Sequence, residues 1–562
     1  TPSPPLDESP AVRGGHGGPP VQDRYWILVA TVAALLSFGS FLYFLSQGMT
    51  NHYGDGVAHV NIARKVVDSP DDSLWRRYIQ IGSPWLPLQT VLILPFVSND
   101  WMWRSGIAGS VVSMISFVIA AVSLYSLALN LYGKEEGGWR VLAALSVGVF
   151  LLNPSALFMQ ATPMSEMVFI AALLAATCLL QRWVANQTSG HLVLAAAAMS
   201  VATLSRYEAW PIAALAIPIV ALASQGNYAM KARCTALFAG VVAIGPLYWF
   251  WHNWAIYGNP LEFLIGPHSA RGIYLQNRAG LGWSEIFVGR AWLDAVTILT
   301  AAAVCAGPLV LLLGIAGLTR TVVAHRRSLI ELSPAILLLV PLVFHVVSLY
   351  RGEIQIFPLS VFGLLNARYG LLHLPAIALF VPAAALILPV RARSWAKAVV
   401  FAIVLAQYGY LVSEGPSQLA VYQEGYRNGV NTRTARRLAR ASAFLRANPV
   451  GGVTLMNTGA LGPLVSRGGL RFSELIHEGT IRWHQIADHI PADVLTVIFE
   501  EGDPLDQRFR QNPALVRDLE LNFREEFSAG KMRLLRRVGG DQDRQGAPVM
   551  FRTSQPSQQD GA

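Results

Sequence analysis

Long apolar segments, separated mostly by short polar loops, occupy the chain up to about residue 413. A helix needs about 20 mostly apolar residues to cross the hydrocarbon core of a membrane. By this pattern we predict eleven membrane-spanning helices, at residues 25–47, 105–131, 139–157, 165–184, 190–205, 209–224, 235–256, 292–318, 330–349, 371–390 and 395–413. The sequence therefore predicts an all-α polytopic membrane domain over residues 23–413.

One further apolar segment, Trp85–Val97, is too short to cross a membrane. It has 13 residues and is interrupted by prolines, whereas a span requires about 20. We predict that it lies in or dips into the membrane interface, within a first outer loop at residues 48–104. This choice determines the side on which every later loop emerges.

The charges of the loops agree with that choice. With Trp85–Val97 excluded, several short basic loops fall on the side of the N-terminus, and they contain Lys231, Arg233, Arg320, Arg326, Arg327, Arg391, Arg393 and Lys397. Lysine and arginine concentrate in cytoplasmic loops. We therefore predict a cytoplasmic N-terminus, with the loops at 48–104, 257–291 and 350–370 and everything after residue 413 on the outer side.

The sequence changes character after residue 413. Helical patterns there alternate with short apolar segments such as Val453–Met456 and Val494–Phe499, which predicts a small extracytoplasmic α/β domain at residues 414–540. Residues 1–22, rich in Pro and Gly, and the polar residues 541–562 are predicted to be disordered tails.

Composition supports a membrane protein and argues against a nucleic-acid partner. Apolar residues make up 53% of the chain and charged residues 14%, and the mean hydropathy is +0.41, so the charges are too few to solvate a soluble surface of this size. The net charge is +9. The basic residues are scattered among short loops and form no continuous run, so loop asymmetry explains them better than nucleic-acid binding does.

Asp55 is the residue around which we expect the site to be built. It stands between two glycines just beyond the first span, at the start of a short amphipathic helix. Aspartate at such a place either caps the helix or carries chemistry. His59 follows one helical turn later and forms with Asp55 the spacing of a metal-binding pair. Without a third ligand at matching spacing we predict no metal site, although a divalent metal remains an open alternative.

Other polar residues lie at the ends of apolar segments, where ionisable groups are costly and usually mark a cavity or a paired site. On the predicted topology all of them map to the outer face. They are Glu166, Arg206, Tyr207, Glu208, His252, Asn253, Arg351, Glu353, Arg368 and Tyr369. Simpler explanations exist for some: Arg206 and Glu208 can form an interfacial ion pair, Glu166 can cap a helix, and Arg368 can extend toward the interface.

Several motifs, taken in order, carry a family resemblance. They are D-G-V-A-H-V-N-I-A-R in the first outer loop, S-P-W-L-P-L, T-P-M-S-E at the head of a span, R-Y-E-A-W, and A-R-Y-G-L-L-H-L-P-A before a late span. Together, over residues 25–413, they resemble the GT-C superfamily of membrane glycosyltransferases. Within it, the chain is most similar to bacterial proteins related to protein O-mannosyltransferases and to the aminoarabinose transferase of lipid A.

The resemblance implies a GT-C-like fold and a reaction. In that family an acidic residue in the first extracytoplasmic loop is the catalytic base and the sugar donor is a polyprenyl phosphate or pyrophosphate lipid. Carried onto this sequence, the base is Asp55. Many members have an Asp-Glu pair there, whereas this chain has Gly56 after Asp55.

One carboxylate is chemically sufficient, because a polyprenyl phosphate leaves as a stabilised anion and needs no second acid. Arginine forks suit the phosphate, so Arg206, Arg351 and Arg368 are the expected phosphate ligands. The expected function is inverting transfer of a sugar from the lipid to an unidentified protein, lipid or glycan acceptor, at the outer face of a bacterial cytoplasmic membrane and with no cofactor.

Two other classes remain open at this stage. A carrier or flippase of a lipid-linked saccharide would have ionisable groups near the middle of the membrane and on both sides, whereas here they concentrate at one face. A non-catalytic subunit that keeps the GT-C scaffold is favoured by Gly56.

Overall fold

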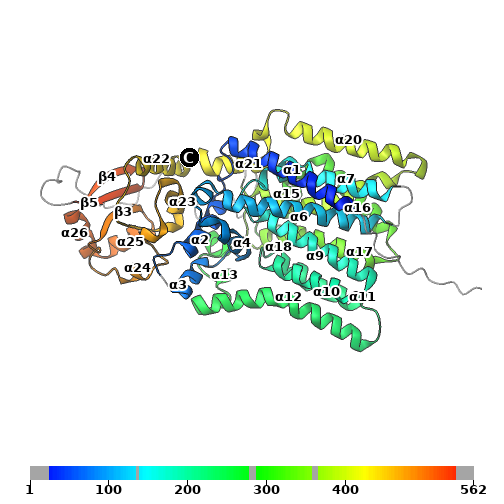
Figure 1. Cartoon of the computed structure of the whole chain (residues 1–562), viewed down its shortest axis with the longest axis horizontal. Coiled ribbons are helices and arrows are strands. Elements are labelled where there is room, and N and C mark those ends of the chain that lie inside the picture. The colour runs from blue at the N-terminus through cyan, green and yellow to red at the C-terminus, as the bar shows by residue number, and fades with distance from the viewer. Residues whose placement is uncertain (1–23, 72, 134–137, 278–285, 357–364, 539–562) are drawn as a thin grey trace, which may run out of the picture.

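The chain folds into a long helical bundle with a smaller α/β domain at one end (Figure 1). The structure is a computed structural model, and it describes residues 24–71, 73–133, 138–277, 286–356 and 365–538. The predicted N-terminal tail, 1–22, and C-terminal tail, 541–562, lie outside the described residues. Short helices of the first loop lie between the bundle and the α/β domain, at the same end.

Helices occupy all eleven predicted spans. The bundle consists of α1 (Tyr25–Ser46), α6 (Ile107–Tyr132), α7 (Trp139–Leu151), α9 (Glu166–Asn186), α10 (Ser189–Thr203), α11 (Ala209–Ala223), α12 (Tyr228–Tyr257), α15 (Ala291–Ala306), α16 (Pro308–Ala324), α17 (Leu329–Ile336) with η4 (Leu337–Leu339) and α18 (Val340–Tyr350), η5 (Ala367–His373) with α19 (Leu374–Phe380) and η6 (Val381–Ile387), η7 (Val390–Ala392) and α20 (Arg393–Leu411). Over the described residues, seven helices are long and apolar enough to span a membrane, or eight crossings if one bent pair is included.

The expectation of a continuous span at 292–318 was wrong. α15 and α16 meet at an angle of 112°. The break falls at Gly307, which has a φ of 91°, and Pro308 follows it, so the helix cannot continue through this point. α15 packs on η5 and α18, whereas α16 packs on α19 and η6. The two helices therefore follow the two halves of one neighbouring segment, in the manner of a broken span or a re-entrant loop.

Three of the predicted spans are helices shorter than a membrane is thick. α7, α10 and α11 have 13, 15 and 15 residues, so each is about 20 to 22 Å long against a hydrocarbon core of about 30 Å. The turn between α10 and α11 is consequently recessed within the bundle. Its charged residues Arg206 and Glu208 have side chains only 12% and 5% exposed.

The first loop folds into short helices at the end of the bundle. They are α2 (Gly54–Val67), α3 (Leu74–Tyr78), η1 (Ile79–Ile81), α4 (Leu88–Val97) and α5 (Asp100–Ser105). The Trp85–Val97 segment forms α4, which has 10 residues and a length of about 15 Å. α4 packs against α2 and α6, so it supports the helix that carries Asp55.

The α/β domain is built on a five-stranded sheet of order β2-β1-β3-β5-β4. Its elements are η8 (Pro416–Gln418), α21 (Ala420–Tyr426), the π-helical turn η9 (Arg427–Asn431), α22 (Arg433–Ala447), β1 (Val453–Met456), α23 (Thr458–Gly468), η10 (Phe472–Glu474), β2 (Leu475–Ile476), α24 (Ile481–Gln485), β3 (Val494–Glu500), α25 (Pro504–Gln511), α26 (Pro513–Asn522), β4 (Phe523–Ala529) and β5 (Met532–Arg537). β1 pairs in parallel with β2 and β3, and β5 pairs antiparallel with β3 and β4. The expected fold class is confirmed.

Polar contacts fasten this domain to the first loop. Lys65 of α2 donates to Thr458 Oγ1 at 2.6 Å and lies 3.4 Å from Glu478. Arg104 donates to the carbonyl oxygens of Ser466 and Leu470 near the end of α23. α2 is therefore held between the bundle and the α/β domain, and this fixes the position of its first turn.

Candidate active site

Asp55 lies in the first turn of α2 and does not cap it. The N-cap position belongs to Tyr53, and Asp55 Oδ2 instead accepts a 2.6 Å hydrogen bond from Arg368 Nη2. Gly56 allows this approach, because a Cβ there would come within 2.9 Å of Pro163 Cγ. Glycine at position 56 thus lets α2 pack closely against the loop that precedes α9. Glu166 is the first residue of α9.

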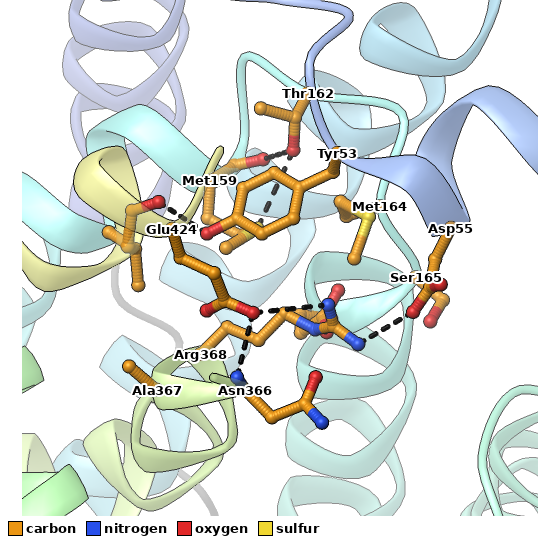
Figure 2. Close-up of polar contacts among 12 residues, drawn as sticks. Tyr53, Asp55, Met159, Thr162, Met164, Ser165, Asn366, Ala367, Arg368 and Glu424 are labelled. Carbon is orange, nitrogen blue, oxygen red and sulfur yellow. Dashed lines mark hydrogen bonds and ion pairs between the residues drawn. The ribbon is translucent and has the colours of Figure 1, made fainter. Parts of the chain in front are cut away.

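Arg368 is the centre of a buried ionic cluster (Figure 2). Besides Asp55, it donates through Nε to Glu166 Oε1 at 2.9 Å, and its Nη1 lies 3.8 Å from Glu424 Oε1. The Arg368 side chain is only 7% exposed. A buried guanidinium is stable only when carboxylates surround it, so this residue holds together α2, α9, η5 and α21.

Arg206 extends the cluster through the same acid. Its Nη1 lies 3.2 Å from Glu166 Oε1, and its Nη2 lies 2.9 Å from Glu208 Oε1. The ring of Tyr369 lies close to both guanidiniums, with 5.1 Å from its centroid to Arg206 Cζ and 5.5 Å to Arg368 Cζ. The structure thus brings together five of the residues singled out in the sequence, with Tyr369 as their aromatic partner.

Three members of the cluster were missed in the sequence. His345 Nε2 lies 3.1 Å from Glu208 Oε1, and His345 Nδ1 lies 3.4 Å from His373 Nε2. Both histidines interrupt apolar helices, a signal that could have identified them. Glu424 belongs to an ordinary amphipathic stretch outside the membrane helices, and nothing in its local sequence sets it apart.

The environment of the recessed turn fixes its charges. Burial would lower the pKa of Arg206, but the carboxylates of Glu208 and Glu166 outweigh it and raise that pKa. Burial would raise the pKa of Glu208, but Arg206 and then His345 lower it well below its usual range. Both groups therefore stay ionised at neutral pH.

Glu424 has a different environment. Its Oε1 accepts a 2.8 Å hydrogen bond from the backbone N–H of Asn366, a residue whose φ of 55° turns the chain toward the carboxylate. Its Oε2 has no hydrogen-bond partner among the described residues. Burial raises the pKa of Glu424 to about 7, against the pull of Arg368.

Tyr207, His252 and Asn253 form a separate group that supports the first loop. Tyr207 donates to the carbonyl oxygen of Pro84 at 2.7 Å. His252 contacts Tyr78 Oη and the Gly82 carbonyl oxygen, and Asn253 accepts from Ser83. These three residues hold the segment after α3 and lie outside the ionic cluster.

Arg351 and His59 lie outside the ionic cluster. Arg351 is 55% exposed and pairs with Glu353 at 2.7 Å, so the expected grouping of three arginines is corrected to two. His59 is buried against the Trp85 ring, with 5.1 Å between ring centroids, and burial lowers its pKa to about 4. The described residues contain no group of three His, Cys, Asp or Glu side chains suited to a metal ion.

An apolar cavity of about 100 Å³ lies beside the cluster, where α15 and α16 bend. Its lining comprises Leu299, Ala302, Leu311, Gly314, Ile315, Leu318, Leu338, Leu339, Leu342, His373, Ala376, Ile377 and Phe380. Leu299 and Ile315 are exposed on the outside of the bundle. Through His373 and His345 the cavity lies two side chains away from Glu208.

Comparison with known proteins identifies the fold. No family model matches the sequence, and no curated protein matches it. The crystal structure of ArnT from Cupriavidus metallidurans bound to undecaprenyl phosphate superposes with a TM-score of 0.51 at 13% identity, covering 93% of this chain and 100% of that one.

Two more distant matches have TM-scores below 0.5. ArnT in the apo state gives 0.49 at 14% identity, covering 92% of this chain and 99% of that one. The archaeal oligosaccharyltransferase AglB from Archaeoglobus fulgidus, in complex with an inhibitory peptide and a dolichol-phosphate, gives 0.46 at 12% identity, covering 92% and 74%. The first match shows that the chain has the fold of that ArnT structure, and its many apolar helices make it a multi-pass membrane protein.

Proposed function

We propose that this protein transfers a sugar from a polyprenyl-phosphate lipid to an acceptor hydroxyl, with inversion, at the outer face of a bacterial cytoplasmic membrane. The observation that carries the proposal is the contrast in exposure within the ionic cluster. The Asp55 carboxylate is 42% exposed, whereas those of Glu166, Glu208 and Glu424 are 0%, 5% and 1% exposed. Only Asp55 among them can meet an acceptor arriving from outside.

In this reaction the acceptor oxygen attacks the anomeric carbon, and the bond from that carbon to the phosphate oxygen breaks. The phosphate leaves with the bonding electrons, and the acceptor proton goes to the Asp55 carboxylate. Arg368 Nη2 touches Asp55 at 2.6 Å, so a phosphate held by the same guanidinium would lie beside the base. This adjacency supports Asp55 as base and Arg368, with Arg206, as the phosphate-binding pair.

The lipid tail has a suitable place in the apolar cavity at the α15–α16 bend. Its lining is almost wholly aliphatic, and it lies next to the ionic cluster. The solved ArnT structure of the same fold contains undecaprenyl phosphate, a lipid of the class we propose here.

Filling this cavity is expected to affect long donors selectively. Ala376 lines it, and Ala376→Phe should raise KM for a long-chain polyprenyl donor by about tenfold, equivalent to about two unburied methylenes. KM for a farnesyl-chain donor should change little. Ala398→Phe on exposed α20 is the control; equal effects of Ala376→Phe on both chain lengths would place the tail elsewhere.

The proposed orientation is testable by labelling in intact cells. In a Cys234→Ser background, which removes the half-buried native thiol, Ser417→Cys in η8 should react with a membrane-impermeant maleimide. Ser328→Cys, between α16 and α17, should react only after permeabilisation, because basic loops stay in the cytoplasm. Labelling at position 328 in intact cells would show that the proposed orientation of the chain in the membrane is wrong.

A further inference from the structure

The ionic cluster carries more negative than positive charge. The carboxylates of Asp55, Glu166, Glu208 and Glu424 face the guanidiniums of Arg206 and Arg368. When all are ionised, the excess is two negative charges. A lipid phosphate would add another in a poorly solvated site, where repulsion is strong. Binding of the phosphate is therefore favourable only if the cluster gains a positive charge.

Glu424 is the carboxylate that the cluster holds least tightly. Glu166 Oε1 accepts from both guanidiniums, Glu208 Oε1 from Arg206, and Asp55 Oδ2 from Arg368, all within 3.2 Å. Glu424 Oε1 lies 3.8 Å from Arg368 Nη1, beyond hydrogen-bond distance. The Oε2 atoms of both Glu424 and Glu166 are buried without a partner among the described residues, but only Glu424 has no guanidinium within hydrogen-bond distance. Oε2 of Glu424 can therefore accept a proton without losing an existing contact or a close ion pair.

We infer that Glu424 takes up one proton when a lipid phosphate binds at Arg368, so that donor binding is coupled to proton uptake. This inference rests on the function proposed above. The proton comes from the solvent and forms the O–H bond on Oε2, and no other bond changes. For a donor phosphodiester, which has a single negative charge, the total charge of the site is then the same before and after binding.

Few titratable groups near Glu424 could take up this proton in its place. The titratable groups that act on Glu424 are Arg368 of η5 and Asp55 of α2, the Tyr53 phenol and the Cys305 thiol of α15. Among the other elements packed on α21, α8 (Pro154–Met159) and η8 contain no titratable side chain, and η9 contributes Arg427. Phenols and thiols usually titrate above neutral pH. Glu424, with a pKa raised by burial to about 7, is therefore the group poised to change charge.

The test uses the full chain in detergent and farnesyl methyl phosphate, a diester whose charge is constant across the pH range. Calorimetric titrations in buffers of different ionisation enthalpy count protons directly. We expect uptake approaching one proton above about pH 7. Affinity should be constant below that pH and fall by up to about tenfold per pH unit above it, because the free form must then acquire the proton on binding.

Two variants complete the experiment. Glu424→Gln, neutral at every pH, should bind with the low-pH affinity throughout and take up no proton. Glu414→Gln, on an exposed residue of the same segment, should behave as the unmodified protein. Binding without proton uptake overturns this inference and leaves the proposed function standing; no binding at any pH overturns both. The proton count needs only the unmodified chain, so it decides the question even if Glu424→Gln does not fold.

Discussion

Replacing Asp55 with asparagine is expected to lower the rate of sugar transfer by about a hundredfold to ten-thousandfold, the usual contribution of a general base. Asparagine keeps the size of the side chain and an oxygen that can accept from Arg368, but it cannot take the acceptor proton. Arg368 also keeps its hydrogen bond to Glu166. The thermal unfolding temperature should therefore change little. Undecaprenyl phosphate should still bind, at least as tightly as to the unmodified protein, because the site has lost one negative charge.

The natural control is Asp100→Asn. Asp100 belongs to the same outer loop, is 43% exposed and pairs with a buried arginine, Arg64, at 2.7 Å. It therefore matches Asp55 in exposure and in having a buried arginine partner, but it lies outside the cluster. The rate of sugar transfer is measured as the release of free polyprenyl phosphate from a lipid extract that contains polyprenyl-phosphate-linked sugar. Full activity of Asp55→Asn would remove Asp55 from the mechanism, and loss of lipid binding together with activity would make it a positioning residue.

Substitution of Arg368 should have the largest combined effect on folding and binding. Arg368→Gln leaves Glu424 buried without a cation and Glu166 with Arg206 alone, and breaking a buried pair in this way costs about 3–5 kcal/mol of stability. Arg368→Lys keeps the charge, but an ammonium group cannot reproduce the fork that reaches Asp55 and Glu166 at once. We expect undecaprenyl phosphate binding to be lost in the first variant and weakened at least about tenfold in the second.

Arg351→Gln tests the one of the three expected phosphate-binding arginines that lies outside the ionic cluster. Arg351 is exposed and bonded to Glu353, so its loss should change stability by less than about 0.5 kcal/mol and leave lipid binding unchanged. Thermal unfolding and titration with undecaprenyl phosphate, measured side by side on Arg368→Gln, Arg368→Lys and Arg351→Gln, decide which arginine binds the phosphate. A folded Arg368→Lys variant with unmodified affinity would show that the phosphate binds elsewhere.

The sequence alone predicted the membrane domain, the terminal α/β domain and most residues of the ionic cluster. Apolar length and strand patterns are local properties, so they determine local elements directly. Charged residues at the ends of apolar segments are costly unless paired, and for this reason Glu166, Arg206, Glu208 and Arg368 could be singled out without knowing their partners.

Only the tertiary structure decided which of these residues meet. Asp55 and Arg368 are separated by 313 positions, and their contact depends on how α2 and η5 pack, which no local pattern encodes. The same packing leaves Arg351 outside the ionic cluster and breaks the 292–318 segment at Gly307. It also buries Glu424, which comes from a segment with no distinctive composition. Local sequence determined where charge is buried, whereas the packing of distant helices determined which charges neutralise one another.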